Sequence, residues 1–307
     1  MSETSPHPDD ALPIIDAHHH FWELGHGRYP WLEAHVIPFR YGDYSALRKS
    51  YLLDQFKAEH GRHRVLKSVH MEAEWNPADP VGETRWLHAL HDQTGWPHAM
   101  VGQIWFDRED VAEVLAGHAS FPLVRSVRQK PKATPTADEF EAGLPGSMAD
   151  PVFRSGYAQL ERHGLHYDLQ TPWWHLGEAA DLAADFPDTL IILNHCGMPS
   201  DRAPDALSDW REAVGRFADR PNTAVKISGF GVPGQAWTPE LQSGIVRDLI
   251  RLFGPDRCMM ASNFPVDSLC ASYDEIFAGL KTITRDLPAS LRHDLFYGTA
   301  DRVYRPV

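Results

Sequence analysis

Short apolar runs alternate with longer amphipathic patterns along almost the whole chain. Runs rich in Val, Ile and Leu, which predict strands, occupy Pro13–His18, Val65–Glu72, Ala99–Trp105, Leu123–Gln129, Leu165–Gln170, Thr189–His195, Thr223–Ser228 and Arg257–Asn263. Such runs are typical of parallel strands that are covered on both faces. Eight strand–helix alternations in 307 residues predict one (β/α)8 TIM barrel. A doubly wound open sheet is the alternative, but no glycine-rich phosphate turn follows the first run.

Several of the intervening helices carry start and stop signals. A capping residue followed by proline predicts helix starts at Pro80, Pro151 and Pro239. Ser272 and Glu275 have the spacing of a capping box, and Gly254-Pro255 predicts the end of the preceding helix.

Three connections after predicted strands are long. They run over 21–44, 130–149 and 229–237, after strands 1, 4 and 7. All three leave the carboxyl ends of strands, which form the catalytic face of such a barrel, so we expect them to wall a pocket. The first is rich in aromatic residues, namely Phe21, Trp22, Tyr29, Trp31, Phe39, Tyr41 and Tyr44.

Composition narrows the choice of partners and compartment. The chain has 29 basic and 42 acidic residues, a net charge of −13, which argues against nucleic acid and anionic membranes as partners. We interpret residues 1–12 as a flexible polar arm without signal-peptide features and residues 13–307 as the barrel domain. Three widely spaced cysteines favour a reducing, cytoplasmic location. A homo-oligomer is compatible with the sequence.

The segment "IIDAHHHFW" is the strongest local chemical signal. Alternation along a strand predicts that Asp16, His18 and His20 share one face. Two histidines at this spacing suit a Zn²⁺ site, whereas the alternative is a chance histidine run on a surface loop.

Polar residues also stand at or near the ends of the other predicted strands. Each of these residues could instead have a structural role as an ion-pair or hydrogen-bond partner. Polar residues at so many strand ends are nevertheless hard to explain as parts of the core, because a buried charge is costly unless it is paired or bound. They are Glu72, Arg128, Gln170, His195, Lys226 and Asn263.

Five motifs in this order resemble the amidohydrolase superfamily, specifically the lactonase branch of the amidohydrolase-2 type. They are "IIDAHHHFW", "VHMEAEWNP", "VRSVRQKP", "LNHCGMP" and "MMASNFPVD". The resemblance extends from Pro13 to the end of the chain. It implies His18, His20 and His195 as metal-site histidines, Glu72 as an active-site acid and further ligand, and Arg128 as the group that binds a substrate carboxylate.

The chain departs from this family at strand 8, where Asn263 replaces the usual aspartate. An amide can orient water or substrate but cannot act as a general base. We therefore expect the base to be Asp267, His195 or a metal-bound hydroxide. Asp267 has the alternatives of capping the next helix or pairing with an arginine.

The resemblance implies a hydrolase of a small, carboxylated lactone, assisted by a divalent metal, Zn²⁺ in the first instance and Mn²⁺ as the alternative. Catalysis without a metal, hydrolysis of an amide or another C–O or C–N bond, and a non-hydrolytic lactone isomerase or decarboxylase remain open, as does a binding barrel without chemistry. We expect a small-molecule substrate to contact Arg128, Gln170, Trp173, Trp22 and Lys226.

Overall fold

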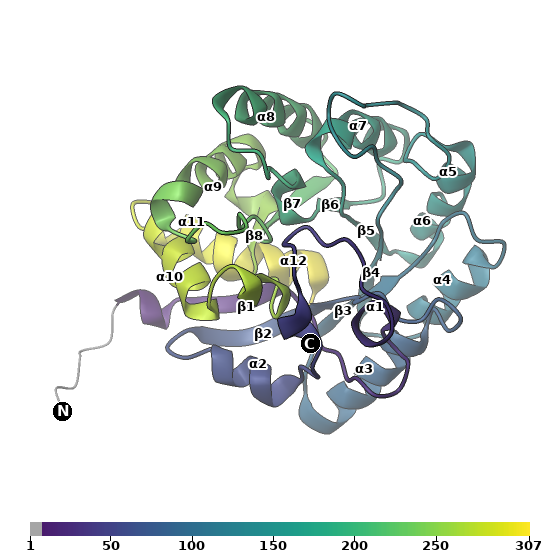
Figure 1. Ribbon diagram of the computed structural model, residues 1–307, viewed down its shortest axis with the longest axis horizontal. Coiled ribbons are helices and arrows are strands. Elements are labelled where there is room, and N and C mark those ends of the chain that lie inside the picture. Colours follow the sequence, from purple (N-terminus) through teal and green to yellow (C-terminus); the bar gives the residue numbers. More distant parts are fainter. Residues whose placement is uncertain (1–7) are drawn as a thin grey trace.

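The computed structural model of the chain describes residues 8–307, and its eight parallel strands follow one another around a barrel (Figure 1). The strands are β1 (Pro13–His19), β2 (Arg64–Met71), β3 (Ala99–Gln103), β4 (Val124–Gln129), β5 (His166–Leu169), β6 (Ile191–Leu193), β7 (Thr223–Ile227) and β8 (Cys258–Met260). The predicted TIM barrel is confirmed. Strands β6 and β8 end before the polar residues His195 and Asn263, which continue the chain beyond the ladder.

The barrel closes between β8 and β1 at the carboxyl ends. The backbone N–H of Asn263 donates to the carbonyl of His18 over 2.8 Å, and the N–H of His20 donates to the carbonyl of Phe264 over 2.7 Å. The first and last motifs of the chain therefore lie next to each other, although about 245 residues separate them.

Most of the helices surround the ring of strands (Figure 1). They are α1 (Pro30–Glu33), α2 (Leu53–Glu59), α3 (Gly82–Thr94), α4 (Val111–Ala119), α5 (Pro151–Tyr157), α6 (Leu160–His163), α7 (Leu176–Asp185), α8 (Pro204–Ala218), α9 (Pro239–Phe253), α10 (Tyr273–Ile283), α11 (Ala289–His293) and α12 (Thr299–Tyr304). Short 3-10 turns at 45–47, 173–175, 195–197, 255–257 and 266–269 and a π turn at 294–298 connect them.

The cap signals predicted most helix starts correctly. The Asp150 carboxylate accepts from the N–H of Val152 at the start of α5, and the Thr238 hydroxyl accepts from the N–H of Leu241 at the start of α9. Ser272 and Glu275 form the predicted capping box. The predicted start at Pro80 is wrong by two residues, because Asp79 closes a turn onto Gly82 and α3 begins there.

The barrel interior is closed from the amino-terminal side by α12. Its Tyr304 reaches into the barrel, where the hydroxyl donates to the Asp168 carboxylate at 2.8 Å and 3.0 Å. The Lys226 ammonium lies 2.8 Å from the same carboxylate, and both side chains are fully buried. This ion pair satisfies two charges that would be costly to bury singly.

The amino-terminal arm begins in residues 1–7, which lie outside the described residues. Residues Pro8–Ala11 form a 3-10 turn, and the Asp9 carboxylate pairs with Arg292 over 2.7 Å. Within residues 8–307, no helix combines the length and the hydropathy that a membrane span requires.

Candidate active site

A β-bulge sets the direction of the histidine run. The β1–β2 register shifts between Asp16 and His19. Asp16 points outward and accepts a hydrogen bond from the Tyr273 hydroxyl of α10. The expectation that Asp16 shares a face with His18 and His20 is therefore wrong, because the bulge interrupts the strict alternation of side chains.

Three imidazoles meet at the barrel mouth. The ring centroid of His18 lies 4.6 Å from that of His195 and 5.1 Å from that of His20. Burial lowers the pKa of all three rings well below the usual value. The Arg128 cation also lowers the pKa of all three rings, and the Arg40 cation also lowers that of His195. The rings are therefore neutral, the form in which imidazole accepts protons or binds a metal.

The hydrogen bonds of these rings leave nitrogen lone pairs at the centre of the cluster. The Nδ1 of His20 lies 2.9 Å from the carbonyl oxygen of Met71 and must donate to it, so Nε2 of the neutral ring is an acceptor. The Nδ1 of His195 bonds the Ser228 hydroxyl over 3.2 Å. Both nitrogens of His18 are buried and have no hydrogen-bond partner among residues 8–307.

Asn263 lies beside this cluster, and Asp267 lies behind it. The amide Nδ2 of Asn263 donates to Oδ1 of Asp267 over 2.7 Å, which leaves its Oδ1 3.3 Å from Nε2 of His20. Asp267 also accepts from the Tyr41 hydroxyl and the N–H of Gly229. Burial raises the pKa of Asp267, whereas the Arg40 cation and these hydrogen bonds lower it.

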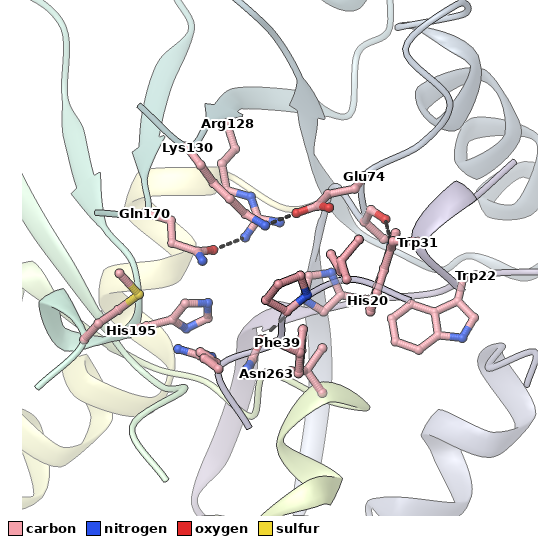
Figure 2. A pocket seen from close by; sticks show the side chains of 16 residues that line it. His20, Trp22, Trp31, Phe39, Glu74, Arg128, Lys130, Gln170, His195 and Asn263 are labelled. Atoms are coloured by element: carbon pink, nitrogen blue, oxygen red, sulfur yellow. Dashed lines mark hydrogen bonds and ion pairs between the residues drawn. The ribbon is translucent and has the colours of Figure 1, made fainter. Parts of the chain in front are cut away.

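A cavity of about 240 Å³ opens above the imidazoles (Figure 2). Polar groups from several strand ends face an aromatic and aliphatic wall from the first loop, a combination typical of small-molecule sites. The lining residues are His20, Trp22, Trp31, Ile37, Pro38, Phe39, Arg40, Ala73, Glu74, Arg128, Lys130, Gln170, His195, Met198, Asn263 and Val266.

Strained backbone concentrates around this cavity. Six described residues other than glycine have positive φ, and four of them line it: Glu74 at 58°, His195 at 54°, Met198 at 53° and Asn263 at 56°. Left-handed backbone is costly for such residues and tends to cluster at functional sites. Three of these four residues are not histidines, so the backbone supports the cavity as the functional site apart from its imidazoles.

A second cavity of about 320 Å³ lies beside the first and shares part of its wall. Glu72 lines this second cavity. Its carboxylate accepts from Nε of Arg128 at 2.5 Å, and its carbonyl oxygen accepts from Nη2. The remaining Nη1 donates to Gln170 over 3.2 Å. Arg128 and Glu72 therefore neutralise each other between the two cavities.

The predicted site residues separate into groups. His20, His195, Asn263, Arg128, Gln170 and Trp22 line the first cavity, and His18 lies against His20 and His195. Four others lie elsewhere: Glu72 at the second cavity, Asp267 behind Asn263, Lys226 inside the barrel, and Trp173 beside Gly197.

Lining residues that the sequence analysis did not assign include Glu74, Lys130 and Met198, whereas Trp31 and Phe39 belong to the aromatic loop. Glu74 and Lys130 form an ion pair across the strand ends (Figure 2). Glu74 stands three residues after β2 and Lys130 directly after β4, and these places near strand ends could have suggested them.

The histidine nitrogens have the chemistry that a divalent cation requires of its ligands. Within the described residues, neither nitrogen of His18 has a partner, and the Nε2 lone pair of His20 faces Asn263 Oδ1. Among residues 8–307, no group of three His, Cys, Asp or Glu side chains has the geometry of a metal site. The set differs from the predicted one, because Glu72 is engaged by Arg128.

Comparisons with known proteins show the family to which the chain belongs. The sequence profile described as "Amidohydrolase" matches residues 15–305. An uncharacterized protein of Sinorhizobium fredii, y4mH, is 40% identical and covers 96% of this chain and 99% of its own. An L-fucono-1,5-lactonase of Burkholderia multivorans is 28% identical over 94% of this chain and 95% of its own.

A solved amidohydrolase from Burkholderia multivorans has the same overall structure. It matches with a TM-score of 0.79 and 26% identity, covers 96% of this chain and 99% of its own, and was crystallised with bound Zn. Together with the profile match and the 40% identical relative, this shows that the chain is a hydrolase of the amidohydrolase family.

Proposed function

We propose that the protein opens the ring ester of a small lactone at the first cavity. The observation that carries this proposal is the convergence of neutral histidines and Asn263 below a pocket with an aromatic wall. The full-length similarity to L-fucono-1,5-lactonases supports the lactone class.

His195 is the proton acceptor that we propose for the attacking water. Among the lining residues, His20, His195 and Glu74 can accept a proton, and Glu74 is paired with Lys130. In hydrolysis, water bonds the carbonyl carbon, its proton moves to His195, and the ring C–O bond breaks. His195 then returns this proton to the ring oxygen, so that the product is a hydroxy acid.

Asn263 and Arg128 have positioning roles in this proposal. The amide oxygen of Asn263 can accept from the attacking water, and Arg128 retains N–H groups that can donate to a substrate oxygen or carboxylate. Gln170 and Trp22 would contact the substrate ring. The substrate contacts expected of Lys226 and Trp173 have no support from their positions.

A divalent ion, Zn²⁺ in the first instance, would be held by His18 and His20, because His195 must keep a free ring nitrogen to accept the proton. When bound it supplies Lewis acidity toward a carbonyl and lowers the pKa of water. Asn263 would still orient the attacking water.

A panel of five- and six-membered lactones, with and without carboxylate groups, tests the proposal in a pH-stat. Hydrolysis releases one proton for each lactone opened and incorporates ¹⁸O from labelled water. Lactone isomerisation, the second candidate, is favoured by the absence of an aspartate at position 263. Turnover without proton release or ¹⁸O uptake would support isomerisation over hydrolysis.

A further inference from the structure

The second cavity has the features of a ligand subsite, which the lactonase proposal does not use. It shares Trp31, Ile37, Glu74, Arg128 and Lys130 with the first cavity. A ligand that occupies one cavity is therefore in contact with the wall of the other. Each cavity is at or below the low end of the size range for small-molecule sites, ~300 to 1,000 Å³, so a two-ring ligand would need both.

Flat aromatic surfaces dominate the lining of this cavity. Trp31, Trp75 and Trp105 line it together with Pro30, Pro77 and Ile104. Trp31 is buried in α1, Trp75 is buried in the loop after β2, and Trp105 is half-buried just after β3. Tryptophan faces are suited to packing against the flat face of a ring.

The polar groups of the cavity favour a ligand with hydroxyl groups. Gln103 lines the cavity and is 7% exposed, yet its Oε1 is buried and bonds no donor in the part of the chain that the structure describes. An unpaired buried acceptor is costly, and a hydroxyl donor would satisfy it. The neighbouring Gln129, in contrast, already accepts from the N–H of Phe106.

The charges of the cavity favour a neutral ligand. Its cations Arg128 and Lys130 are paired with Glu72 and Glu74 respectively. Among the described residues that line the cavity, Arg128 and Lys130 thus each have a carboxylate partner, and the carboxylate oxygens can accept further hydroxyl hydrogen bonds.

We propose that the second cavity binds a neutral, hydroxylated ring, such as a sugar, that the lactone carries as a substituent. This inference rests on the proposed lactonase function, because the reactive ring must occupy the first cavity. The substituent would pass beside the Glu74–Lys130 pair, which forms part of both walls.

The test compares each lactone hydrolysed in the panel with the same lactone carrying a β-glucosyl or a phenyl substituent on each free hydroxyl in turn. For at least one attachment point we expect the glucosyl form to have a kcat/KM about tenfold above that of the bare lactone. This ratio should fall toward one in Trp105→Ala and in the near-isosteric Gln103→Leu. Trp174→Ala, which removes a half-buried tryptophan that lines neither cavity, should preserve the ratio.

Three results would overturn the inference. They are a bare lactone preferred over every glucosyl form, a ratio that neither Trp105→Ala nor Gln103→Leu changes, and a phenyl form preferred over the glucosyl form. Failure of the lactonase proposal is distinguishable, because it would abolish turnover of all the lactones. In that case, titration with methyl β-D-glucopyranoside, followed by tryptophan fluorescence, measures sugar binding at the second cavity without catalysis. Binding that is abolished in Trp105→Ala would support the sugar subsite.

Discussion

The amide of Asn263 donates to Asp267 over 2.7 Å, so its oxygen faces Nε2 of His20 and not the carboxylate. A carboxylate can only accept in this arrangement, and it therefore fixes which end of the amide points toward the imidazoles. Asp267 does not line either cavity. This geometry makes Asp267 a positioning residue and disfavours it as the base.

Substitutions of Asp267 distinguish these roles. Asparagine at 267 can still accept from Asn263, so we expect Asp267→Asn to lower kcat by less than about tenfold and Asp267→Ala by about a hundredfold or more. Steady-state kinetics on variants whose fold is verified by circular dichroism measures this. Equal losses in both variants would instead identify Asp267 as the base, because neither side chain can accept a proton.

Metal content should depend on His18. Protein purified without chelator should contain about one equivalent of Zn²⁺. His18→Ala should lose most of this metal, because removal of one of a few imidazole ligands lowers the affinity of the site strongly. Elemental analysis by mass spectrometry measures the metal directly. His118→Gln removes a buried imidazole far from the cluster and should retain the metal. Wild-type protein that is free of metal and still opens lactones would contradict the metal part of the proposal.

We expect Lys226 to stabilise the fold and not to bind substrate. Lys226→Met leaves the Asp168 carboxylate buried without its cation, for which we expect a loss of about 3–5 kcal/mol in the free energy of unfolding. The double variant Asp168→Asn/Lys226→Met should recover part of this loss. Urea titrations measure both. A raised KM at unchanged unfolding free energy would support the substrate contact that the sequence predicted.

Acid should destabilise the fold through its buried histidines. Burial lowers the pKa of His118 to about 4. The unfolded chain therefore binds more protons than the folded one between the ordinary histidine pKa, about 6.5, and about 4. The contribution of His118 to the free energy of unfolding is fully present above this pH range. About 3 kcal/mol of it is lost as the pH falls through the range. Burial raises the pKa of Asp16 to about 6, and this opposes the trend.

Denaturant titrations from pH 7.5 to pH 4.5 measure this loss. In His118→Gln, which keeps polar groups near the Gln103 carbonyl and the Thr84 hydroxyl, the unfolding free energy should fall less steeply toward acid pH. Parallel profiles for the two proteins would show that His118 does not contribute to the acid sensitivity.

The barrel and much of the site could be read from the sequence. The strand count, the caps at Asp150 and Thr238, and the cavity residues His20, His195 and Asn263 all followed from local patterns or from the family resemblance. These features are accessible because periodicity and capping involve residues a few positions apart.

Side-chain direction was not accessible in the same way. A bulge against β2 turned Asp16 outward, Arg128 drew Glu72 to the second cavity, and Asp168 held Lys226 inside the barrel. Each outcome depends on a partner from another strand that is remote in the chain. The local sequence therefore specifies which groups stand at each strand end, whereas the contacts between strands determine which of them reach the cavity.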